Sequence, residues 1–193
     1  MTRIGWIVLG GIVLVVALFA SLLSFGGERV VGSPKVTFDP TTTVAETTPG
    51  LPALQVPVAG VARGQIADSW GDARGEGRQH HGTDIMAPGG TPVLAAAGGT
   101  IEKLFQSRLG GTTLYQRSAD RRWTFYYAHL AGYAAGVHEG QAVRAGEVIG
   151  YVGDTGDAGA GNYHLHFGLA RVSPEQHWYE ADDVNAYPAL RGR

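Results

Sequence analysis

Two histidines one residue apart interrupt an apolar run in the segment NYHLHFGL, residues 162–169. Side chains alternate between the two faces of a β-strand, so His164 and His166 would share one face while Leu165 and Phe167 share the other. Neutral imidazole is a common metal ligand and also titrates near neutral pH. The pair is therefore a candidate for metal binding or acid–base chemistry, although a half-exposed strand with solvated histidines would show the same pattern.

Two more potential metal ligands lie upstream, in the segment GRQHHGTDIMAPGGTPV at residues 77–93. His80 and Asp84 are four positions apart, and a turn through Gly82 would bring both side chains to one point. Together with a histidine of the H-x-H pair, they would supply three nitrogen and oxygen ligands and leave a fourth tetrahedral position for water. A catalytic zinc requires this arrangement.

Short strands must position these side chains, because the region that carries them consists of apolar segments separated by Gly-rich or polar turns. Six segments have the pattern of a β-strand: 91–97, 99–105, 112–117, 123–130, 147–153 and 163–170. None of the intervals between them has a long helical period, and the 30 glycines of the chain suit tight turns better than long helices. The sequence predicts an all-β or mainly-β domain.

A further histidine ends the segment WTFYYAHL, residues 123–130. Alternation places His129 on the same face as Phe125 and Tyr127, and Ala128 on the opposite face. Both faces are largely apolar, which predicts a central strand that is covered on both sides and a histidine where the core opens. A hydrogen bond from the imidazole to a loop carbonyl would account for His129 equally well.

Composition excludes several classes of site and partner. The chain has no cysteine, so it has no disulfide, thiolate ligand or cysteine nucleophile, and any metal must be held by His, Asp or Glu. The formal net charge of −2 and the pI near 6.4 indicate no basic surface for nucleic acid.

The first 25 residues differ from the rest. Between residues 4 and 25 the sequence has no charged residue, and as a helix this stretch would span roughly 33 Å, enough to cross a bilayer core. We expect residues 1–25 to be a transmembrane anchor, with an N-terminal signal peptide as the alternative. The Thr/Pro/Gly-rich residues 26–55 are predicted to be a flexible linker. Residues 56–193 would then form one domain outside the cytoplasm.

Three ordered motifs make the domain resemble the lysostaphin-type (LytM-type) zinc endopeptidases, which cut peptides of the bacterial cell wall. HHGTD at 80–84 resembles the family's H-x-G-x-D motif, and YYAHL at 126–130 resembles its Y-x-H-L motif. GEVIGYVGDTGDAGAGNYHLHFGL at 146–169 resembles its G-x-x-G-x-T-G motif followed by H-L-H-F. The likeness covers about residues 57–170 and implies the antiparallel-sheet fold of these peptidases.

The resemblance also implies a site and an activity. One Zn²⁺ per chain would bind His80, Asp84 and His166, while His129 and His164 would act as acid–base group and oxyanion stabiliser, in an order that the sequence leaves open. The implied function is zinc-dependent hydrolysis of peptidoglycan peptides in the cell envelope, by an enzyme that contacts the membrane through its N-terminal helix. The sequence identifies no protein activator.

Two positions depart from the family pattern. The family often has a tyrosine shortly before its first ligand, whereas the first tyrosine here is Tyr115, so Arg74 and Arg78 are candidates to replace it. Asn162 and Tyr163 stand where a small residue or proline is usual before H-L-H-F. We expect this change to reshape one wall of the groove and to alter substrate preference.

Other interpretations fit less well. A non-catalytic, membrane-tethered scaffold of the same fold, which binds peptidoglycan or activates another hydrolase, would not need all five site residues. A cupin-like binder would need a glutamate after the H-x-H pair, and a lipoyl-type carrier would need a lysine at a hairpin tip; both are missing. His81, His138 and His177 are expected on the surface, and residues 120–122 at an exposed hairpin tip.

Overall fold

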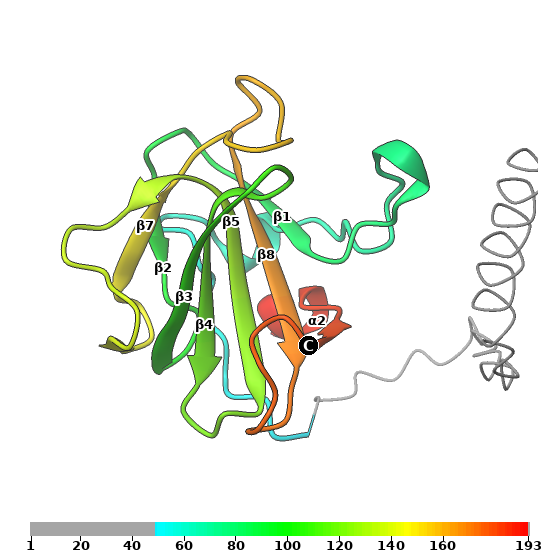
Figure 1. Ribbon diagram of the computed structural model, residues 1–193. Helices are drawn as coiled ribbons and strands as arrows, with labels where there is room; N and C mark the ends of the chain where they lie inside the picture. Colours follow the sequence, from blue (N-terminus) through cyan, green and yellow to red (C-terminus); the bar gives the residue numbers. More distant parts are fainter. Residues whose placement is uncertain (1–48, 193) are drawn as a thin grey trace, which may run out of the picture. The chain divides into compact units, whose positions relative to one another are not determined.

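The computed structural model describes residues 49–192, which fold mainly as β-strands (Figure 1). The predicted anchor, residues 1–25, and most of the predicted linker, residues 26–55, lie outside the described residues. Leu54, at the end of that linker segment, is buried in the core of the domain. Within the part of the chain that the structure describes, no helix is both long and apolar enough to span a bilayer.

Within residues 49–192, nine antiparallel strands form one sheet, which confirms the predicted mainly-β fold. The strands are β1 (Thr83–Met86), β2 (Pro92–Leu94), β3 (Gly99–Ser107), β4 (Gly111–Ser118), β5 (Trp123–Tyr133), β6 (Ala142–Val143), β7 (Val148–Val152), β8 (His164–Arg171) and β9 (Asp182–Val184). The described helical segments are η1 (Arg63–Gln65), η2 (Gly75–Gly77) and α2 (Tyr187–Arg191).

The six predicted strands correspond to β2, β3, β4, β5, β7 and β8. The prediction for residues 91–97 is too long, because β2 ends at Leu94 and the alanines that follow it are buried outside the ladder. The sequence does not predict β1, β6 and β9, which have two to four residues each. Strands this short carry too little alternation to be recognised.

Strand β8 organises the neighbourhood of the H-x-H pair. It pairs with β5 along one edge and with both β1 and β9 along the other. In this register His166 lies opposite Asp84 of β1 and Ala128 of β5, and Ala170 lies opposite Asp183 of β9. Because directly opposed residues share a face of the sheet, the ladder places these side chains on one side.

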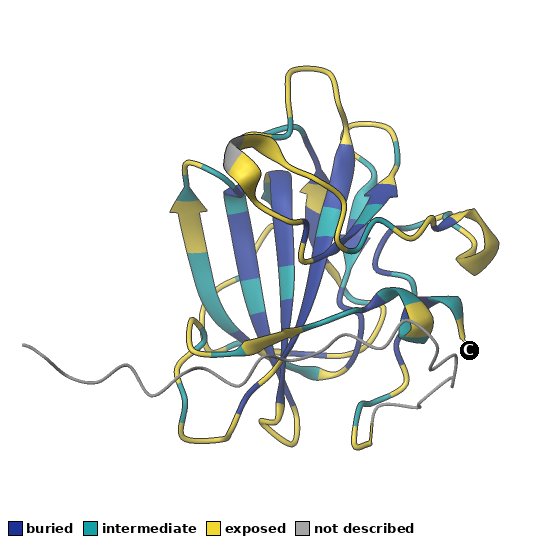
Figure 2. Cartoon of the chain, turned by 90° about the vertical axis from the view of Figure 1, so that its right-hand side faces the viewer, coloured by how far each residue is buried: buried dark blue, intermediate teal, exposed yellow. Residues whose placement is uncertain are grey.

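The other face of β8 and β5 is the core of the domain (Figure 2). Leu165 and Phe167 of β8 are fully buried together with Phe125 and Tyr127 of β5, and the rings of Tyr127 and Phe167 meet edge to face at 5.4 Å. Truncating a buried phenylalanine of this kind costs about 3–5 kcal/mol of stability. The predicted alternation along the H-x-H segment is therefore confirmed.

The alternation of side chains between the two faces of β5 is interrupted at His129. β5 carries one extra residue between its pairings with Leu114 and Thr112 of β4, and His129 has a positive φ of 60°. An extra residue of this kind is a β-bulge, which changes the direction of the side chains beside it. His129 turns toward His164, with ring centroids 4.8 Å apart. The predicted placement of His129 on the face of Tyr127 is therefore wrong.

Several surface predictions are confirmed. Residues 120–122 are exposed and lie in the turn between β4 and β5, where Arg121 adopts a positive φ. His81, His138 and His177 are exposed.

Candidate metal centre

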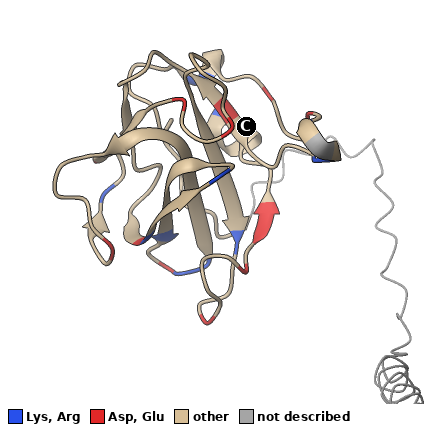
Figure 3. Ribbon diagram, turned by 45° about the horizontal axis from the view of Figure 1, so that its top comes forward, with Lys and Arg blue, Asp and Glu red and all other residues tan. Residues whose placement is uncertain are grey.

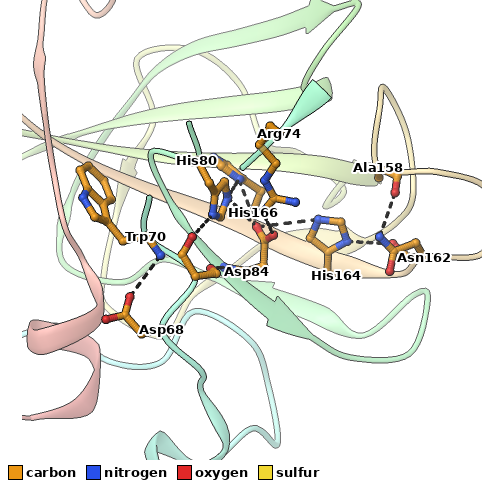
Figure 4. A network of polar contacts seen from close by, with 10 residues as sticks. Asp68, Trp70, Arg74, His80, Asp84, Ala158, Asn162, His164 and His166 are labelled. Carbon is orange, nitrogen blue, oxygen red and sulfur yellow. Dashed lines mark hydrogen bonds and ion pairs between the residues drawn. The ribbon is translucent and has the colours of Figure 1, made fainter. Parts of the chain in front are cut away.

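Three side chains converge on one point beside β8 (Figure 4). His80 Nε2 lies 3.0 Å from Asp84 Oδ1, and His166 Nδ1 lies 3.2 Å from the same oxygen. The two ring nitrogens are 2.8 Å apart. The register of β1 on β8 sets Asp84 beside His166, and His80 approaches from the segment before β1. A Cβ atom at Gly82 would lie 2.5 Å from the His166 ring, so only glycine permits this approach.

The backbone fixes the orientation of the His80 ring. His80 Nδ1 lies 2.6 Å from the carbonyl oxygen of Ser69. A carbonyl only accepts hydrogen bonds, so Nδ1 carries the proton and Nε2 of the neutral ring presents its lone pair to Asp84. Ser69 also accepts a hydrogen bond on its hydroxyl from the backbone N–H of Asp84, at 3.0 Å. One residue thus positions two of the converging groups.

The same hydrogen-bond pattern holds the other two histidines. His129 Nδ1 lies 2.8 Å from the carbonyl oxygen of Thr155, and His164 Nδ1 lies 2.8 Å from that of Asn162. In both rings Nδ1 is therefore the donor, which leaves Nε2 as the second ring nitrogen that can exchange a proton. His164 Nε2 lies 3.9 Å from Asp84 Oδ1. The loop-carbonyl interpretation of His129 and a chemical role are thus compatible.

The pKa shifts of these groups favour the protonation states that bind a metal. Burial raises the pKa of Asp84, but its close polar and charge interactions with His166 and His80 outweigh this and hold the pKa well below its usual range. Burial lowers the pKa of His166, against the opposing effect of Asp84. Burial also lowers the pKa of His129. A carboxylate and neutral imidazoles are the states that bind a metal.

The donor set fits a zinc ion. With Nδ1 protonated, the Nε2 lone pair of His80 faces the lone pairs of Asp84 Oδ1 at 3.0 Å, and lone pairs at this distance repel unless a cation or proton lies between them. In a tetrahedral zinc site with bonds of about 2.0–2.1 Å, neighbouring donors are about 3.3 Å apart. Two imidazoles and one carboxylate, partly buried, are a common ligand set for catalytic zinc.

All five predicted site residues line one open cleft of about 630 Å³: His80, Asp84, His129, His164 and His166. Asn162 also lines the cleft, but Tyr163 does not. The Tyr163 side chain is 42% exposed, and its ring lies against the backbone of Gly89. Of the two residues expected to reshape the groove wall, only Asn162 lines the cleft.

The two arginine candidates differ in their contacts. The Arg74 guanidinium donates to Asp84 Oδ2, whereas Oδ1 of that carboxylate faces His80 and His166. Arg78 lies 3.2 Å from Asp157 across the cleft. Only Arg74 touches the candidate metal centre.

Several cleft residues were not predicted from the sequence. Tyr126 meets the His166 ring edge to face at 5.8 Å, and Tyr115 lies beside Tyr126. His81 is exposed as predicted but lines the cleft, where Nδ1 lies 3.0 Å from Asp183. Alternation from His129 would place Tyr126 on the opposite face of the strand, so Tyr126 is recognised only once the bulge is known, and Asp183 only once β9 is paired with β8.

The region of the chain that matches known proteins contains the three sequence motifs. Residues 78–178 match the model of peptidase family M23. The L-Ala--D-Glu endopeptidase of Bacillus subtilis (strain 168) is 39% identical over 130 residues, which are 64% of this chain and 38% of that protein. The chain thus spans about two fifths of this relative's length.

Two solved structures have the same fold. The catalytic domain of lysostaphin from Staphylococcus simulans is 31% identical, with a TM-score of 0.55, over 65% of this chain and 91% of that one. A zinc-containing peptidase from Vibrio cholerae is 26% identical, with a TM-score of 0.54, over 68% of this chain and 39% of that one.

Proposed function

Because the chain belongs to peptidase family M23, we propose that it is a zinc-dependent endopeptidase that hydrolyses peptide bonds of bacterial peptidoglycan. The observation that carries the proposal is the meeting of three potential ligands with two further histidines in one open cleft. Each of the five groups is oriented by a backbone contact or by its neighbour in the ladder. The name of the Bacillus subtilis relative supports a wall peptide as the substrate.

We assign the metal to His80 Nε2, Asp84 Oδ1 and His166 Nδ1, one ion per chain. The facing lone pairs of His80 Nε2 and Asp84 Oδ1, with His166 Nδ1 beside both atoms, support this assignment. When bound in such a site, zinc lowers the pKa of a water ligand toward about 7 and polarises a carbonyl. The partial burial of Asp84 and the hydrogen bond of His80 to Ser69 keep both ligands in the required orientation before substrate arrives.

His129 and His164 would handle the protons. A histidine with a free Nε2 can take a proton from the attacking water and return it to the leaving amine, which contributes typically about 10²- to 10⁴-fold. The neighbouring ring, when Nε2 is protonated, can donate a hydrogen bond to the developing oxyanion. The ring centroids of His129 and His164 are 4.8 Å apart, so both rings can serve one reacting peptide bond.

We further propose that the enzyme acts outside the cytoplasm from a membrane anchor at residues 1–25. The uncharged stretch from residue 4 to residue 25 supports this location. The segment of residues 26–55 would then provide reach, because a flexible chain of about 30 residues averages roughly 30 Å end to end. A substrate in the cell wall requires such a placement.

Two measurements test the proposal together. The purified chain should contain one zinc per molecule, and His166→Ala should lose it. Wild-type protein with zinc should release peptide fragments from purified peptidoglycan, which mass analysis identifies, and a chelator should stop the release. Absence of stoichiometric zinc, or cleavage that resists the chelator, would refute a zinc enzyme. Wall binding without cleavage would instead support the non-catalytic scaffold.

A further inference from the structure

The charged groups of the cleft are unequally partnered. Acidic and basic side chains are interspersed over the described part of the chain (Figure 3). Of the cleft-lining carboxylates, Asp84 contacts Arg74 and Asp157 lies 3.2 Å from Arg78. Asp183 has no lysine or arginine partner among residues 49–192, and its ion-pair contact is with His81. Among the described residues, Asp183 is thus the one cleft-lining carboxylate without a guanidinium or ammonium partner.

Strand pairing places Asp183 at a defined distance from the metal centre. Asp183 lies opposite Ala170 of β8, and Asp84 lies opposite His166 on the same edge of that strand. Four residues separate these positions, which corresponds to about 13 Å along β8. Asp182 lies opposite Arg171, so alternation points its side chain to the other face. Of these two neighbouring carboxylates, only Asp183 lines the cleft.

His81 holds the Asp183 side chain in position. Its Nδ1 atom lies 3.0 Å from the carboxylate, and its ring stacks on Trp70 with centroids 5.2 Å apart. The Asp183 side chain is still 52% exposed, so its remaining acceptor positions are open to a ligand.

Aromatic rings form the wall beside this carboxylate. Tyr115 lines the cleft between Tyr126 and Trp178, with ring centroids 4.6 Å and 4.5 Å away. Burial raises the pKa of the Tyr115 hydroxyl, a hydrogen bond with Tyr126 lowers it, and the negative charge of Asp183 raises it again. The Asp183 carboxylate is therefore close enough to Tyr115 to affect its hydroxyl electrostatically.

A buried arginine keeps this wall rigid. Arg117 is 1% exposed and donates two hydrogen bonds to Glu102, at 2.6 Å and 2.8 Å. It also donates to the carbonyl oxygens of Ser173 and Gln176, in the loop that carries Trp178. The loop whose Trp178 ring packs on Tyr115 is thus tied to β4 through these hydrogen bonds of Arg117.

We propose that the end of the cleft bounded by Asp183, Tyr115 and Ala170 is a subsite for a primary ammonium group of the substrate. A carboxylate accepts strong hydrogen bonds from an ammonium group, and Tyr115 with its neighbouring rings bounds the space beside it. The inference rests on the proposed function and adds to it the charge of the preferred wall peptide. The amine belongs either to the side chain of a diamino acid or to a free peptide terminus.

The distance between Asp183 and the metal centre fits an amine on a side chain of the substrate. A lysine-length side chain reaches about 6 Å, and an extended peptide advances about 3.5 Å per residue. Together they cover the distance of about 13 Å along β8 if the diamino acid stands two residues from the bond that is cut.

The test compares wall fragments with free and with blocked amines. The full chain with zinc digests soluble peptidoglycan fragments, either native or after exhaustive N-acetylation with acetic anhydride. Acetylation should raise the KM of wild-type enzyme about fivefold, the size expected for one exposed ion pair, and leave kcat nearly unchanged. Asp183→Asn should cleave native fragments with the same raised KM and should no longer respond to acetylation.

Matched variants separate the subsite from general effects. Asp182→Asn should behave as wild type, because its carboxylate lies on the other face. Tyr115→Phe should keep the discrimination, since the ring still packs against Tyr126 and Trp178 and bounds the subsite. Mass analysis then assigns each rate to fragments whose free amine lies on a side chain or at a terminus.

Two results would overturn the inference: equal cleavage of native and acetylated fragments by wild type, or an undiminished preference in Asp183→Asn. Failure of the zinc-loaded wild type to cleave either kind of fragment would be a different result. It would refute the proposed function, and the subsite would fall with it.

Discussion

The carbonyl oxygen of Thr155 accepts a hydrogen bond from His129 Nδ1 at 2.8 Å, and this contact determines which ring nitrogen of His129 exchanges protons. The Thr155 hydroxyl in turn accepts from the backbone N–H of Thr112 at 3.0 Å and donates to the carbonyl of Leu130 at 2.9 Å. The loop after β7 is thereby fastened to both strands that flank the bulge. Thr155 is a positioning residue for His129.

We expect Thr155→Val to lower kcat about tenfold with little change in KM, because misplacing a proton-transfer group affects turnover more than binding. Thr155→Ser keeps the hydroxyl and should retain near-normal activity. Initial rates on peptidoglycan fragments, with thermal unfolding curves to compare stability, provide the measurement. Equal kcat in the valine variant and wild type would show that the hydroxyl does not position His129.

Arg74 should strengthen zinc binding through Asp84. Its guanidinium holds Oδ2 of that carboxylate and so leaves Oδ1 toward the two histidines. Loss of a group that orients a ligand typically weakens metal affinity about 10- to 100-fold, and Arg74→Gln should fall in this range. Competition with a chromogenic chelator measures the affinity. Arg78→Gln is the matched control, since Arg78 pairs with Asp157, and an equal loss in both variants would contradict a specific role for Arg74.

Gly82→Ala should disturb the metal centre more than an ordinary surface substitution. The added Cβ atom would lie 2.5 Å from the His166 ring, which must then move. We expect zinc affinity to fall at least about tenfold, since the ring would leave the position that Asp84 and its neighbours define. Gly75→Ala is the control, because nothing lies within 4 Å of its added Cβ atom. Unchanged zinc affinity in Gly82→Ala would show that His166 binds no metal or that the site adapts freely.

Zinc should stabilise the fold as well as support catalysis. A ligand that binds only the folded state at 100 times its Kd stabilises that state by about 2.7 kcal/mol. For a chain of this size, that gain corresponds to a rise in Tm of roughly 5–10 °C. His166→Ala should lose the rise, whereas His138→Ala, a change of an exposed histidine, should keep it. Differential scanning calorimetry with and without zinc measures the change in Tm. A Tm of the wild type that does not depend on zinc would argue against the assigned ligands.

Local alternation predicted much of the fold because a buried face leaves a period of two in the sequence. Along β8 this period correctly separates Leu165 and Phe167 from His164 and His166. The same rule failed at His129, since a bulge depends on how β5 pairs with β4 and leaves no period of its own.

The candidate site, like the fold, could be predicted from the sequence only in part. The resemblance of the three motifs implied the five residues that meet in the cleft, whereas short spacing by itself relates only His80 to Asp84 and His164 to His166. Asp183 and Tyr115 became recognisable only once β9 and β4 were placed beside their neighbours, since each is remote in sequence from the histidines. Tyr163 was expected in the groove, but its side chain packs against Gly89.

The alternation of β8 also ties folding to activity. A slip of one residue in its pairing would carry both histidines into the core and expose the leucines and the phenylalanine to water. The buried apolar face penalises every such misregistered molecule, so chains with misdirected histidines are also those least able to persist as folded protein. Proteolysis of poorly folded chains would therefore also remove the molecules whose histidines are misplaced.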